Sequence, residues 1–458
     1  MSTIVAIATA QAAAGIGVVR VSGPGALAVG DRVFTSVSGR TLSETGGYHA
    51  LFGKVHDGGC VLDEAVALVF RAPKSYTGED VVEISCHGGL YVVRRVLRAV
   101  LNAGAVPAEP GEFTKRAFLN GKLDLSEAEA VTALIAASGE EARAATLGAL
   151  DGALSREIAD CRDTLARAAA FFAAWVDYPD DEIPALSDEE LQHTLGGVRD
   201  RLNALLSRFE AGAAVLGGVD TVLVGRPNVG KSTLLNALSG TDRAIVTDVA
   251  GTTRDVLEET VRVGNVTLRL ADTAGIRSEP GDEIEKIGVE RARERMRRAT
   301  LVLAVLDAAE PLTEDDRALL ARCAGRRCVV VLNKGDLPAR VTEAEITTLF
   351  ADGKTAVVTV SARDGAGMAE LKTAIEEAVG TAGFDPSLPL LTTERQRDCV
   401  RRALSALDEA LDGLAAGITA DAVNVCVDDA VEALGALTGE HATDAVLNEV
   451  FKNFCVGK

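Results

Sequence analysis

The chain has 458 residues, of which 47% are hydrophobic and 25% charged, so it can build the cores of roughly three globular domains. Its formal net charge of −20 excludes a general electrostatic attraction to nucleic acid, so an RNA partner would need a local basic patch. Eight cysteines without a Cys-x-x-Cys pair exclude a disulfide framework and a zinc site, and no apolar run approaches the ~20 residues of a membrane span.

The first basic residue is Arg20, so the start of the chain lacks the charged region of a secretory leader. We therefore expect a cytoplasmic protein without a membrane partner. Two basic clusters, 291–298 and 395–402, also contain acidic residues, which favours solvated helix faces over RNA-binding patches. Seven cysteines are expected to be buried apolar side chains: Cys60, Cys86, Cys161, Cys323, Cys328, Cys399 and Cys426.

Residues 1–120 alternate short β-branched runs with Gly and Pro turns, which is typical of a small α+β domain. The predicted elements are strands over 3–8, 17–21, 65–70 and 81–85, and a helix over 90–101.

Residues 121–218 are predicted to be all helical. Ser126 and Glu129 have the spacing of a capping box, which predicts a helix start. Ala-rich helical sequence then continues to about Val176. Interruptions are expected at Gly139, Gly148 and Gly152.

An acidic loop over 177–182 is predicted to end this helical stretch. A second capping box, Ser187 with Glu190, predicts another helix that runs to about Ala214.

Residues 219–380 alternate strands and helices, which predicts a doubly wound sheet. Its strands are expected at 220–225, 256–263, 266–271, 301–307, 328–332 and 356–360.

Helical sequence returns in 381–458. Thr393 with Gln396 can cap a helix over 394–416, and two further helices are expected at 420–437 and 441–454. The predicted architecture is a nucleotide-binding domain inserted into a helical domain with halves 121–218 and 381–458.

A complete phosphate-binding loop, Gly-Arg-Pro-Asn-Val-Gly-Lys-Ser-Thr, occupies 225–233 between a predicted strand and a predicted helix. Its glycines allow backbone amides to approach phosphates, and Lys231 supplies a positive charge. The Ser232 hydroxyl can bind magnesium. This loop predicts a nucleoside triphosphate without choosing the base.

The base is indicated by Asn333-Lys-Gly-Asp336, which follows a predicted strand. The carboxylate of Asp336 can accept hydrogen bonds from N1 and N2 of guanine, which adenine cannot offer. Lys334 can lie over the base, and the run Ser361-Ala-Arg363 suits a backbone contact to guanine O6.

Two more motifs lie between these. Asp272-Thr-Ala-Gly275 can reach magnesium through water and bind the γ-phosphate, and Gly251-Thr-Thr-Arg-Asp255 offers threonine hydroxyls to the magnesium shell. Five motifs in this order predict a GTP-binding domain.

The motif Asp272-Thr-Ala-Gly275 is followed by Ile276. Ras-like GTPases have a glutamine at this position, which orients the attacking water. Isoleucine cannot form that hydrogen bond, so another group must position the water. Judged from the residues alone, the candidates for this role are Glu285, Asp282 and Glu283. The alternative is that these acids only form a solvated acidic loop.

Over nearly its whole length the chain resembles the bacterial tRNA-modification GTPase family MnmE (TrmE). The C-terminal Cys-x-Gly-Lys is the most discriminating motif, because GTPases of ribosome assembly lack it. The residues that carry the resemblance are the GTPase motifs and Thr3-Ile-Val-Ala6, Arg20-Val-Ser-Gly23, Tyr76-Thr-Gly-Glu-Asp-Val-Val-Glu83, His87-Gly-Gly89, Pro110-Gly-Glu-Phe113, Arg116-Ala-Phe-Leu-Asn-Gly-Lys122 and Phe454-Cys-Val-Gly-Lys458.

The resemblance implies an N-terminal α+β folate-binding-like domain, an all-α helical domain and an inserted Ras-like P-loop GTPase domain. With the motifs, it assigns to GTP the residues Asn228, Val229, Gly230, Lys231, Ser232, Thr233, Thr247, Asp248, Val249, Ala250, Gly251, Thr252, Thr253, Asp272, Thr273, Ala274, Gly275, Asn333, Lys334, Asp336, Ser361, Ala362 and Arg363.

The resemblance also implies metal and cofactor sites. Magnesium would bind Ser232 and Thr253, and Glu285 would be the catalytic glutamate. Potassium would bind Asn228, Thr247, the carbonyl of Val249, and Thr252. A one-carbon tetrahydrofolate, in its 5-formyl or 5,10-methylene form, would contact Arg20, Glu83, Lys122 and Lys458.

The implied activity is GTP hydrolysis that is stimulated by potassium and by dimerisation of the GTPase domains. It would serve addition of an aminomethyl or carboxymethylaminomethyl group to C5 of the wobble uridine in certain tRNAs. The implied partners are a second copy of the chain, tRNA, and the flavoprotein MnmG in a heterotetramer.

Three points stay open. Cys455 is either a nucleophile near the folate or a buried cysteine that holds the terminal helix. The run Gln11-Ala-Ala-Ala-Gly15 departs from the family's Pro- and Gly-rich turn. The competing function is a GTP-controlled binding module, such as a ribosome-assembly factor, which would bind no folate.

Overall fold

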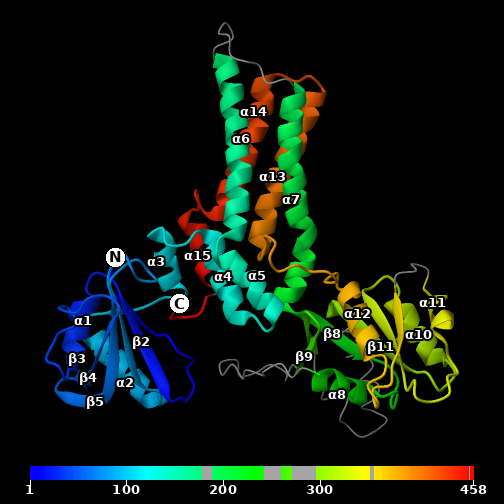
Figure 1. Ribbon diagram of the computed structural model, residues 1–458, viewed down its shortest axis with the longest axis horizontal. Helices are drawn as coiled ribbons and strands as arrows, with labels where there is room; N and C mark the ends of the chain where they lie inside the picture. The colour runs from blue at the N-terminus through cyan, green and yellow to red at the C-terminus, as the bar shows by residue number, and fades with distance from the viewer. Residues whose placement is uncertain (178–187, 242–258, 271–295, 351–354, 453, 458) are drawn as a thin grey trace. The chain divides into compact units, whose positions relative to one another are not determined.

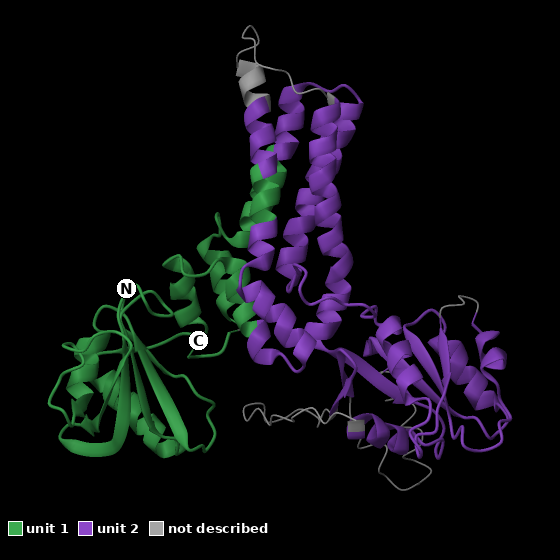
Figure 2. Ribbon diagram, in the orientation of Figure 1, with its two compact units in different colours: residues 1–132, 158–163, 428–458 green, residues 133–157, 164–427 purple. Residues whose placement is uncertain are grey.

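The computed structural model describes residues 1–458 except 178–187, 242–258, 271–295, 351–354, 453 and 458. It contains two compact units. Unit 1 comprises residues 1–132, 158–163 and 428–458, and unit 2 comprises residues 133–157 and 164–427 (Figures 1 and 2). Both ends of the chain therefore belong to unit 1.

Unit 1 contains a seven-stranded sheet with the order β3-β4-β5-β6-β2-β1-β7. Its pairs are antiparallel except β1 with β7. The strands are β1 (Ile4–Ile7), β2 (Ile16–Ser22), β3 (Phe34–Ser36), β4 (His49–Asp57), β5 (Cys60–Phe70), β6 (Val81–His87) and β7 (Val106–Pro107). All four predicted strands exist, whereas β3, β4 and β7 were not predicted.

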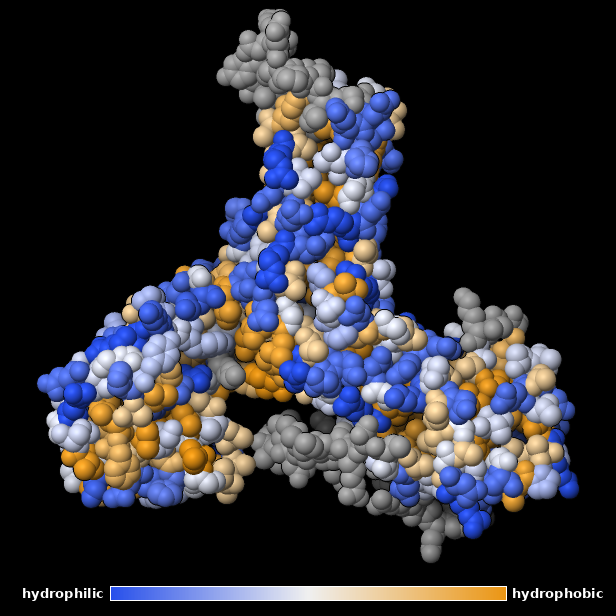
Figure 3. Space-filling view, viewed as in Figure 1, coloured by the Kyte–Doolittle hydropathy of each residue, from blue (hydrophilic) through white to orange (hydrophobic). Residues whose placement is uncertain are grey.

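Two helices, α1 (Ala26–Val33) and α2 (Leu90–Asn102), pack on one face of this sheet and bury its apolar core. Neighbouring strand residues point to opposite faces, so every second residue faces away from these helices. On that other face Phe52 and Val66 lie in register and are 54% and 40% exposed. Figure 3 also shows hydrophobic residues gathered on the visible side of this domain. An uncovered apolar surface of this kind suits contact with another protein surface.

The C-terminal tail of the chain folds against the helices that follow the sheet. Three helices, α3 (Glu112–Leu119), α4 (Leu125–Ala136) and α15 (Asp444–Lys452), meet there. Their shared apolar cluster contains Leu125, Ala128, Leu447, Phe451 and Phe454.

The start of α4 corrects a prediction. The backbone N–H of Glu127 donates to the Asp124 carboxylate (2.8 Å), and the Glu127 carboxylate accepts from the Asp124 N–H (2.9 Å). The capping box is therefore Asp124 with Glu127, and the prediction of Ser126 with Glu129 was wrong. Ser126 and Glu129 belong to the helix itself, and both are buried. The Ser126 hydroxyl donates a hydrogen bond to the Asp124 carboxylate.

Unit 2 contains a six-stranded sheet with the order β13-β12-β11-β8-β10-β9. All neighbouring pairs are parallel except β9 with β10. The strands are β8 (Val219–Val224), β9 (Glu259–Val263), β10 (Val266–Leu270), β11 (Leu301–Asp307), β12 (Cys328–Asn333) and β13 (Ala356–Thr359). They match the six predicted strands to within a few residues and confirm the predicted α/β fold class.

Apolar side chains on both faces of this sheet are buried, because helices cover both faces. These helices include α8 (Lys231–Thr241), α10 (Glu314–Cys323), α11 (Glu343–Thr347) and α12 (Met368–Ala378). The chain leaves β8 for β10 on one side and later returns to β11 on the other. The carboxyl end of β8 is therefore the point of the sheet at which a doubly wound fold binds its ligand.

The remaining helices are α5 (Glu140–Leu150), α6 (Ala153–Asp177), α7 (Asp188–Gly217), α13 (Glu394–Ala415) and α14 (Ala420–Thr438). The cap of α13 is confirmed, since the Thr393 hydroxyl accepts from the Gln396 N–H. The helices are interrupted at Gly139 and Gly152 as predicted, but Gly148 lies inside α5, so that prediction was wrong. The predicted cap at Ser187 lies outside the described residues. No helix in the described ranges is long and apolar enough to cross a membrane.

Candidate functional site

The phosphate-binding loop joins β8 to α8 and has the backbone shape that the motif requires. Gly225 and Gly230 have φ of +154° and +94°, and Asn228 has φ of +66°. A side chain at Gly225 would meet the carbonyl of Val305, and one at Gly230 would collide with the amide of Asn333. Glycine is required at both positions because there is no room for a Cβ atom.

Lys231 is half-buried beneath this loop. Its Nζ donates to the carbonyl oxygens of Gly225 and Arg226, at 2.7 Å in both cases. Burial lowers the pKa of the Lys231 ammonium, because an apolar environment disfavours the charged form. An anionic phosphate placed here would favour the charged form. Ser232, the next residue, is exposed at the N-terminus of α8.

Asn333 connects the base-binding motif to the phosphate-binding loop. Its side chain is buried, its Nδ2 donates to the carbonyl of Val229 (2.9 Å), and its Oδ1 accepts from the N–H of Ala362 (3.1 Å). The loops after β8, β12 and β13 are therefore held together by one amide. This contact places three of the predicted motifs at the same edge of the sheet.

The residues predicted to read guanine lie beside that amide. The hydroxyl of Ser361 donates to Asp336 Oδ1 (3.0 Å), which orients the Asp336 carboxylate, and it lies 3.3 Å from the Asp364 carboxylate. Asp336 is exposed, as a group that receives a base must be. Arg363 is exposed one residue beyond Ala362.

Asp307 is a site residue that the sequence reasoning missed. It ends β11, its side chain is 5% exposed, and its Oδ2 lies 2.6 Å from Nζ of Lys334. Its Oδ1 accepts from the N–H of Ala309 (2.9 Å), so the carboxylate is fixed on both sides. Lys334 itself has φ of +66°. The sequence does contain a signal that could have identified Asp307, because it is an aspartate at the carboxyl end of an otherwise apolar strand.

Arg226 was also missed. Its Nε donates to the buried carboxylate of Asp316 (2.9 Å), and its guanidinium lies 3.2 Å from Glu310. Asp316 also accepts from the N–H of Thr313 at the start of α10. The phosphate-binding loop is thus tied to α10 through one arginine.

Several predicted nucleotide residues lie outside the described residues, and the structure leaves their roles as predictions. The described ranges contain no group of three or more His, Cys, Asp and Glu side chains that could hold a metal. The residues outside are Thr247, Asp248, Val249, Ala250, Gly251, Thr252, Thr253, Asp272, Thr273, Ala274, Gly275, Ile276, Asp282, Glu283 and Glu285.

In unit 1 the structure brings Arg20 and Glu83 together on the sheet face opposite α1 and α2. They are register partners, and Nε of Arg20 donates to Oε1 of Glu83 (2.7 Å). Arg20 also donates to the carbonyl of Gly457 (2.9 Å), and its guanidinium lies 5.7 Å from the ring centroid of Phe113. Lys122 donates to the carbonyl of Pro73 (3.3 Å). Lys458 lies outside the described residues.

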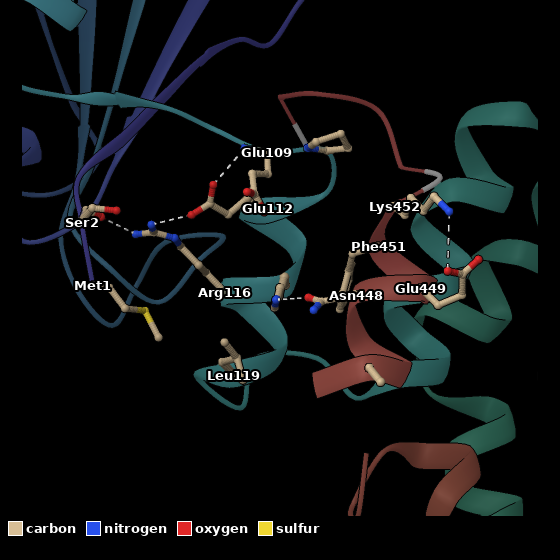
Figure 4. A pocket seen from close by; sticks show the side chains of 13 residues that line it. Met1, Ser2, Glu109, Glu112, Arg116, Leu119, Asn448, Glu449, Phe451 and Lys452 are labelled. Carbon is tan, nitrogen blue, oxygen red and sulfur yellow. Dashed lines mark hydrogen bonds and ion pairs between the residues drawn. The ribbon is translucent and has the colours of Figure 1, made fainter. Parts of the chain in front are cut away.

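A separate cavity of about 610 Å³ lies between α3 and α15 (Figure 4). Arg116, which is 4% exposed, forms part of its wall and donates to the carbonyl of Ser2 (2.7 Å) and to the carboxylates of Glu79 (3.1 Å) and Glu112 (2.7 Å). Lys115 in the same wall donates to Asn448 (2.7 Å). Arg20, Glu83 and Lys122 do not line this cavity, so it is distinct from the predicted folate contacts.

The cysteine predictions need two corrections. Cys60, at a hairpin turn, is exposed and Cys426 is half-exposed, whereas the other five of the seven are buried. Cys455 is exposed, so the alternative of a buried cysteine in the tail was wrong. The tail is held instead by Phe454 in the apolar cluster and by a hydrogen bond from the Gly111 N–H to the Cys455 carbonyl (3.4 Å).

Known proteins match the chain over its whole length. Residues 125–455 match the family model described as MnmE helical domain, and residues 3–122 match GTP-binding protein TrmE N-terminus. The chain is 42% identical to the tRNA modification GTPase MnmE of Heliobacterium modesticaldum, over 100% of this chain and 99% of that one. It is equally 42% identical, with the same coverage, to the protein of that name from Geobacillus kaustophilus.

Among solved structures, the G domain of the T. maritima FeoB iron transporter matches 35% of this chain and 98% of its own. It is 28% identical, with a TM-score of 0.26.

Proposed function

The chain belongs to the MnmE family of tRNA modification GTPases and hydrolyses GTP, and from this premise we propose its substrate, cofactors and partners. It acts with a flavoprotein, MnmG, to add an aminomethyl or carboxymethylaminomethyl group to C5 of the wobble uridine in certain tRNAs. Residues 1–120 bind the folate, 219–380 form the GTPase domain, and 121–218 with 381–458 form the helical domain.

The observation that carries the nucleotide half of this proposal is the pair of hydrogen bonds made by Asn333. They hold the phosphate loop and the two base-reading loops at one edge of the sheet. Lys231 and the loop amides are thereby placed to bind phosphates while Asp336 reads guanine. The phosphate loop and the base-reading loops can therefore bind GTP as a unit.

Hydrolysis requires charge compensation and a positioned water. Ser232 and Thr253 would hold magnesium, and Asn228, Thr247, the Val249 carbonyl and Thr252 would hold potassium; both cations offset the negative charge that develops on the phosphates. The residues in the described part fit this role, since Ser232 and Asn228 are exposed at the loop.

Glu285 would orient the attacking water in place of the missing glutamine.

Asn228 would offer its side-chain amide oxygen to potassium. Its backbone has a left-handed conformation, which asparagine tolerates.

The folate part of the proposal is supported by Arg20 and Glu83. Their side chains are 17% and 23% exposed, so a ligand can reach them, yet they are held in place by each other. A carboxylate can accept from the N–H groups of a pterin, and the cations of Lys122 and Lys458 can pair with the carboxylates of a glutamate tail. The bound one-carbon tetrahydrofolate would supply the carbon unit of the modification.

A second copy of the chain would cover the open sheet face at Phe52 and Val66. A homodimer through this face removes exposed apolar area from water. Light scattering of the purified chain should give twice the monomer mass, and a monomeric mass would contradict the dimer. Co-purification of the flavoprotein MnmG from cells tests the partner.

The experiment that tests the function is nucleoside analysis of tRNA from a strain that lacks this chain. We expect the wobble modification to be absent, to return with the intact chain, and to stay absent with Glu285→Ala, which should still bind GTP. Intact modification in the deletion strain would overturn the proposed reaction. Restoration by Glu285→Ala would overturn only the role of that glutamate.

A further inference from the structure

The outward face of α2 carries a short stripe of one aromatic and three basic residues. Tyr91, Arg94, Arg95 and Arg98 are spaced by three or four residues, which places them on one side of the helix. Tyr91 is 73% exposed, and Arg94 and Arg98 are also exposed. A tyrosine that is so exposed loses the benefit of burial that aromatic rings usually gain.

The charges of this stripe are only partly compensated. Arg95 donates to the Tyr91 hydroxyl (3.2 Å) and lies 3.5 Å from Asp57. Arg94 and Arg98 have no hydrogen-bond or ion-pair partner among the residues that the structure describes. Two guanidinium groups, one helical turn apart, are therefore free to bind anions.

The charge of the surrounding domain makes this stripe stand out. Residues 1–120 contain 11 Lys and Arg against 10 Asp and Glu, whereas the whole chain contains 47 against 67. The domain is thus nearly neutral in a strongly acidic chain. A polyanion that approaches the protein meets least repulsion here, and the local patch required for an RNA partner is present.

A membrane surface is a poorer partner for α2 than a nucleic acid. The apolar residues of the helix, Val93, Val96 and Val100, are buried in the core of the domain. A helix that binds a bilayer must insert its apolar face between lipids. With that face occupied, α2 offers only charges and one ring, and these suit phosphates and an unstacked base.

We propose that α2 is a tRNA-binding surface of this chain. Arg94 and Arg98 pair with backbone phosphates, and the ring of Tyr91 stacks on an exposed base or ribose. This assignment rests on the proposed function only in taking tRNA as the polyanion. It adds a contact region on the helical side of the N-terminal sheet, opposite the face that carries Arg20 and Glu83.

The test compares the affinity of the full-length chain for unmodified tRNA between ~50 and ~300 mM potassium chloride. For R94E/R98E we expect roughly a tenfold or larger loss at ~100 mM salt, and a slope of log affinity against log salt that is smaller by about two, because two phosphate contacts are lost. Tyr91→Leu should weaken binding roughly fivefold and leave the slope unchanged, since stacking releases no counterions.

The matched control is R317E/R322E on α10, which changes the net charge equally at two exposed arginines without partners in the described ranges. Its tRNA affinity should change less than threefold. Unaltered affinity and slope in R94E/R98E, or equal losses in both double variants, would overturn the proposal. Loss of binding to vesicles with ~25% phosphatidylserine, with tRNA binding intact, would assign the surface to lipid. Failure of the unaltered chain to bind tRNA would instead contradict the proposed function.

Discussion

At the scale of single residues, the nucleotide site depends on buried polar side chains that hold its loops to one another. Nδ2 and Oδ1 of Asn333 both form hydrogen bonds within the protein, and both carboxylate oxygens of Asp307 have partners as well. Leaving either partner unsatisfied in a buried position would cost ~1–3 kcal/mol. This cost is the physical reason that the loop geometry is set before GTP arrives.

Asp307 provides a direct test of that preorganisation. Asp307→Asn removes the charge that anchors Lys334 while it keeps the shape of the side chain. We expect the affinities for GTP and GDP to fall alike, by roughly tenfold or ~1.4 kcal/mol, with kcat at saturating GTP nearly unchanged, because uniform binding is lost. Asp315→Asn, at an exposed position of α10, is the control. Unchanged affinity for both nucleotides would show that Lys334 needs no anchor.

Asn228 is the residue at which the potassium proposal can be tested. Replacing potassium by sodium should lower GTP turnover by roughly tenfold or more, a barrier increase of at least ~1.4 kcal/mol. Asn228→Gly keeps the positive φ and removes the amide oxygen, so its turnover should be low and equal in both salts. The measurement is the steady-state rate of GTP hydrolysis of both proteins in each salt, with nucleotide affinity measured in parallel. Equal rates of the unaltered chain in the two salts would refute the potassium site.

At the scale of elements, the β9–β10 hairpin connects the GTPase sheet with the helical region of unit 2. Arg262 on β9 donates to Glu141 on α5 (2.7 Å), and Ser138 shares a hydrogen bond with Thr267 on β10 (2.8 Å). In the sequence the hairpin lies between 242–258 and 271–295, which contain the predicted magnesium ligand Thr253 and catalytic Glu285. This hairpin thus contacts the helices and directly adjoins, in the sequence, the predicted catalytic segments.

We expect the Arg262–Glu141 ion pair to stabilise the hairpin modestly, because both side chains are partly exposed, at 25% and 33%. Arg262→Glu should lower the hydrogen-exchange protection of hairpin amides about two- to fivefold, which corresponds to ~0.5–1 kcal/mol. The charge swap Glu141→Arg with Arg262→Glu should restore it. No recovery in the swapped variant would show that the pair itself contributes nothing.

The elements also show what sequence alone can predict. The strands β11, β12 and β13 of unit 2 were found because their apolar runs are continuous, as a covered parallel sheet requires, and β9 and β10 were found because apolar and polar residues alternate along them. The cap of α4 was misplaced by two residues because Ser126 and Asp124 both precede suitable acids, and only the backbone geometry distinguishes them. The strand β4 was missed because its outward residues include Phe52, so the expected alternation of apolar and polar residues is blurred.

The same limit applies to the site. The motifs identified Lys231, Asn333 and Asp336 because each has a fixed spacing from its neighbours. Arg226 and Asp307 act through partners about ninety and thirty residues away, and no local pattern marks such pairs. The segments with Thr253 and Glu285 stay predictions because they lie outside the described residues.

At the scale of the whole molecule, the two ends of the chain fold together in unit 1. Unit 1 joins residues 1–132 with 428–458, and the GTPase domain is inserted between them in the sequence. The tail reaches β1 and β2 through Gly457, whose carbonyl accepts from Arg20. A folate contact proposed for Lys458 therefore depends on how the preceding residue is docked.

Gly457 is suited to this docking in a way that another residue would not be. Its φ is +102°, and a Cβ atom there would collide with the carbonyl of Ile7. Gly457→Ala should release the tail and lower folate affinity by at least roughly tenfold, while GTP hydrolysis stays within twofold, because the nucleotide site shares no residue with the tail.

Val456→Ala is the control, since Val456 is 53% exposed and its side chain should contribute little to docking. Isothermal titration with 5-formyltetrahydrofolate and a GTPase assay on the same preparations provide both readouts. Equal folate affinity in the two variants would show that the tail does not build the site. A parallel loss of GTP hydrolysis in Gly457→Ala would indicate that the two units fold less independently than their separate cores suggest.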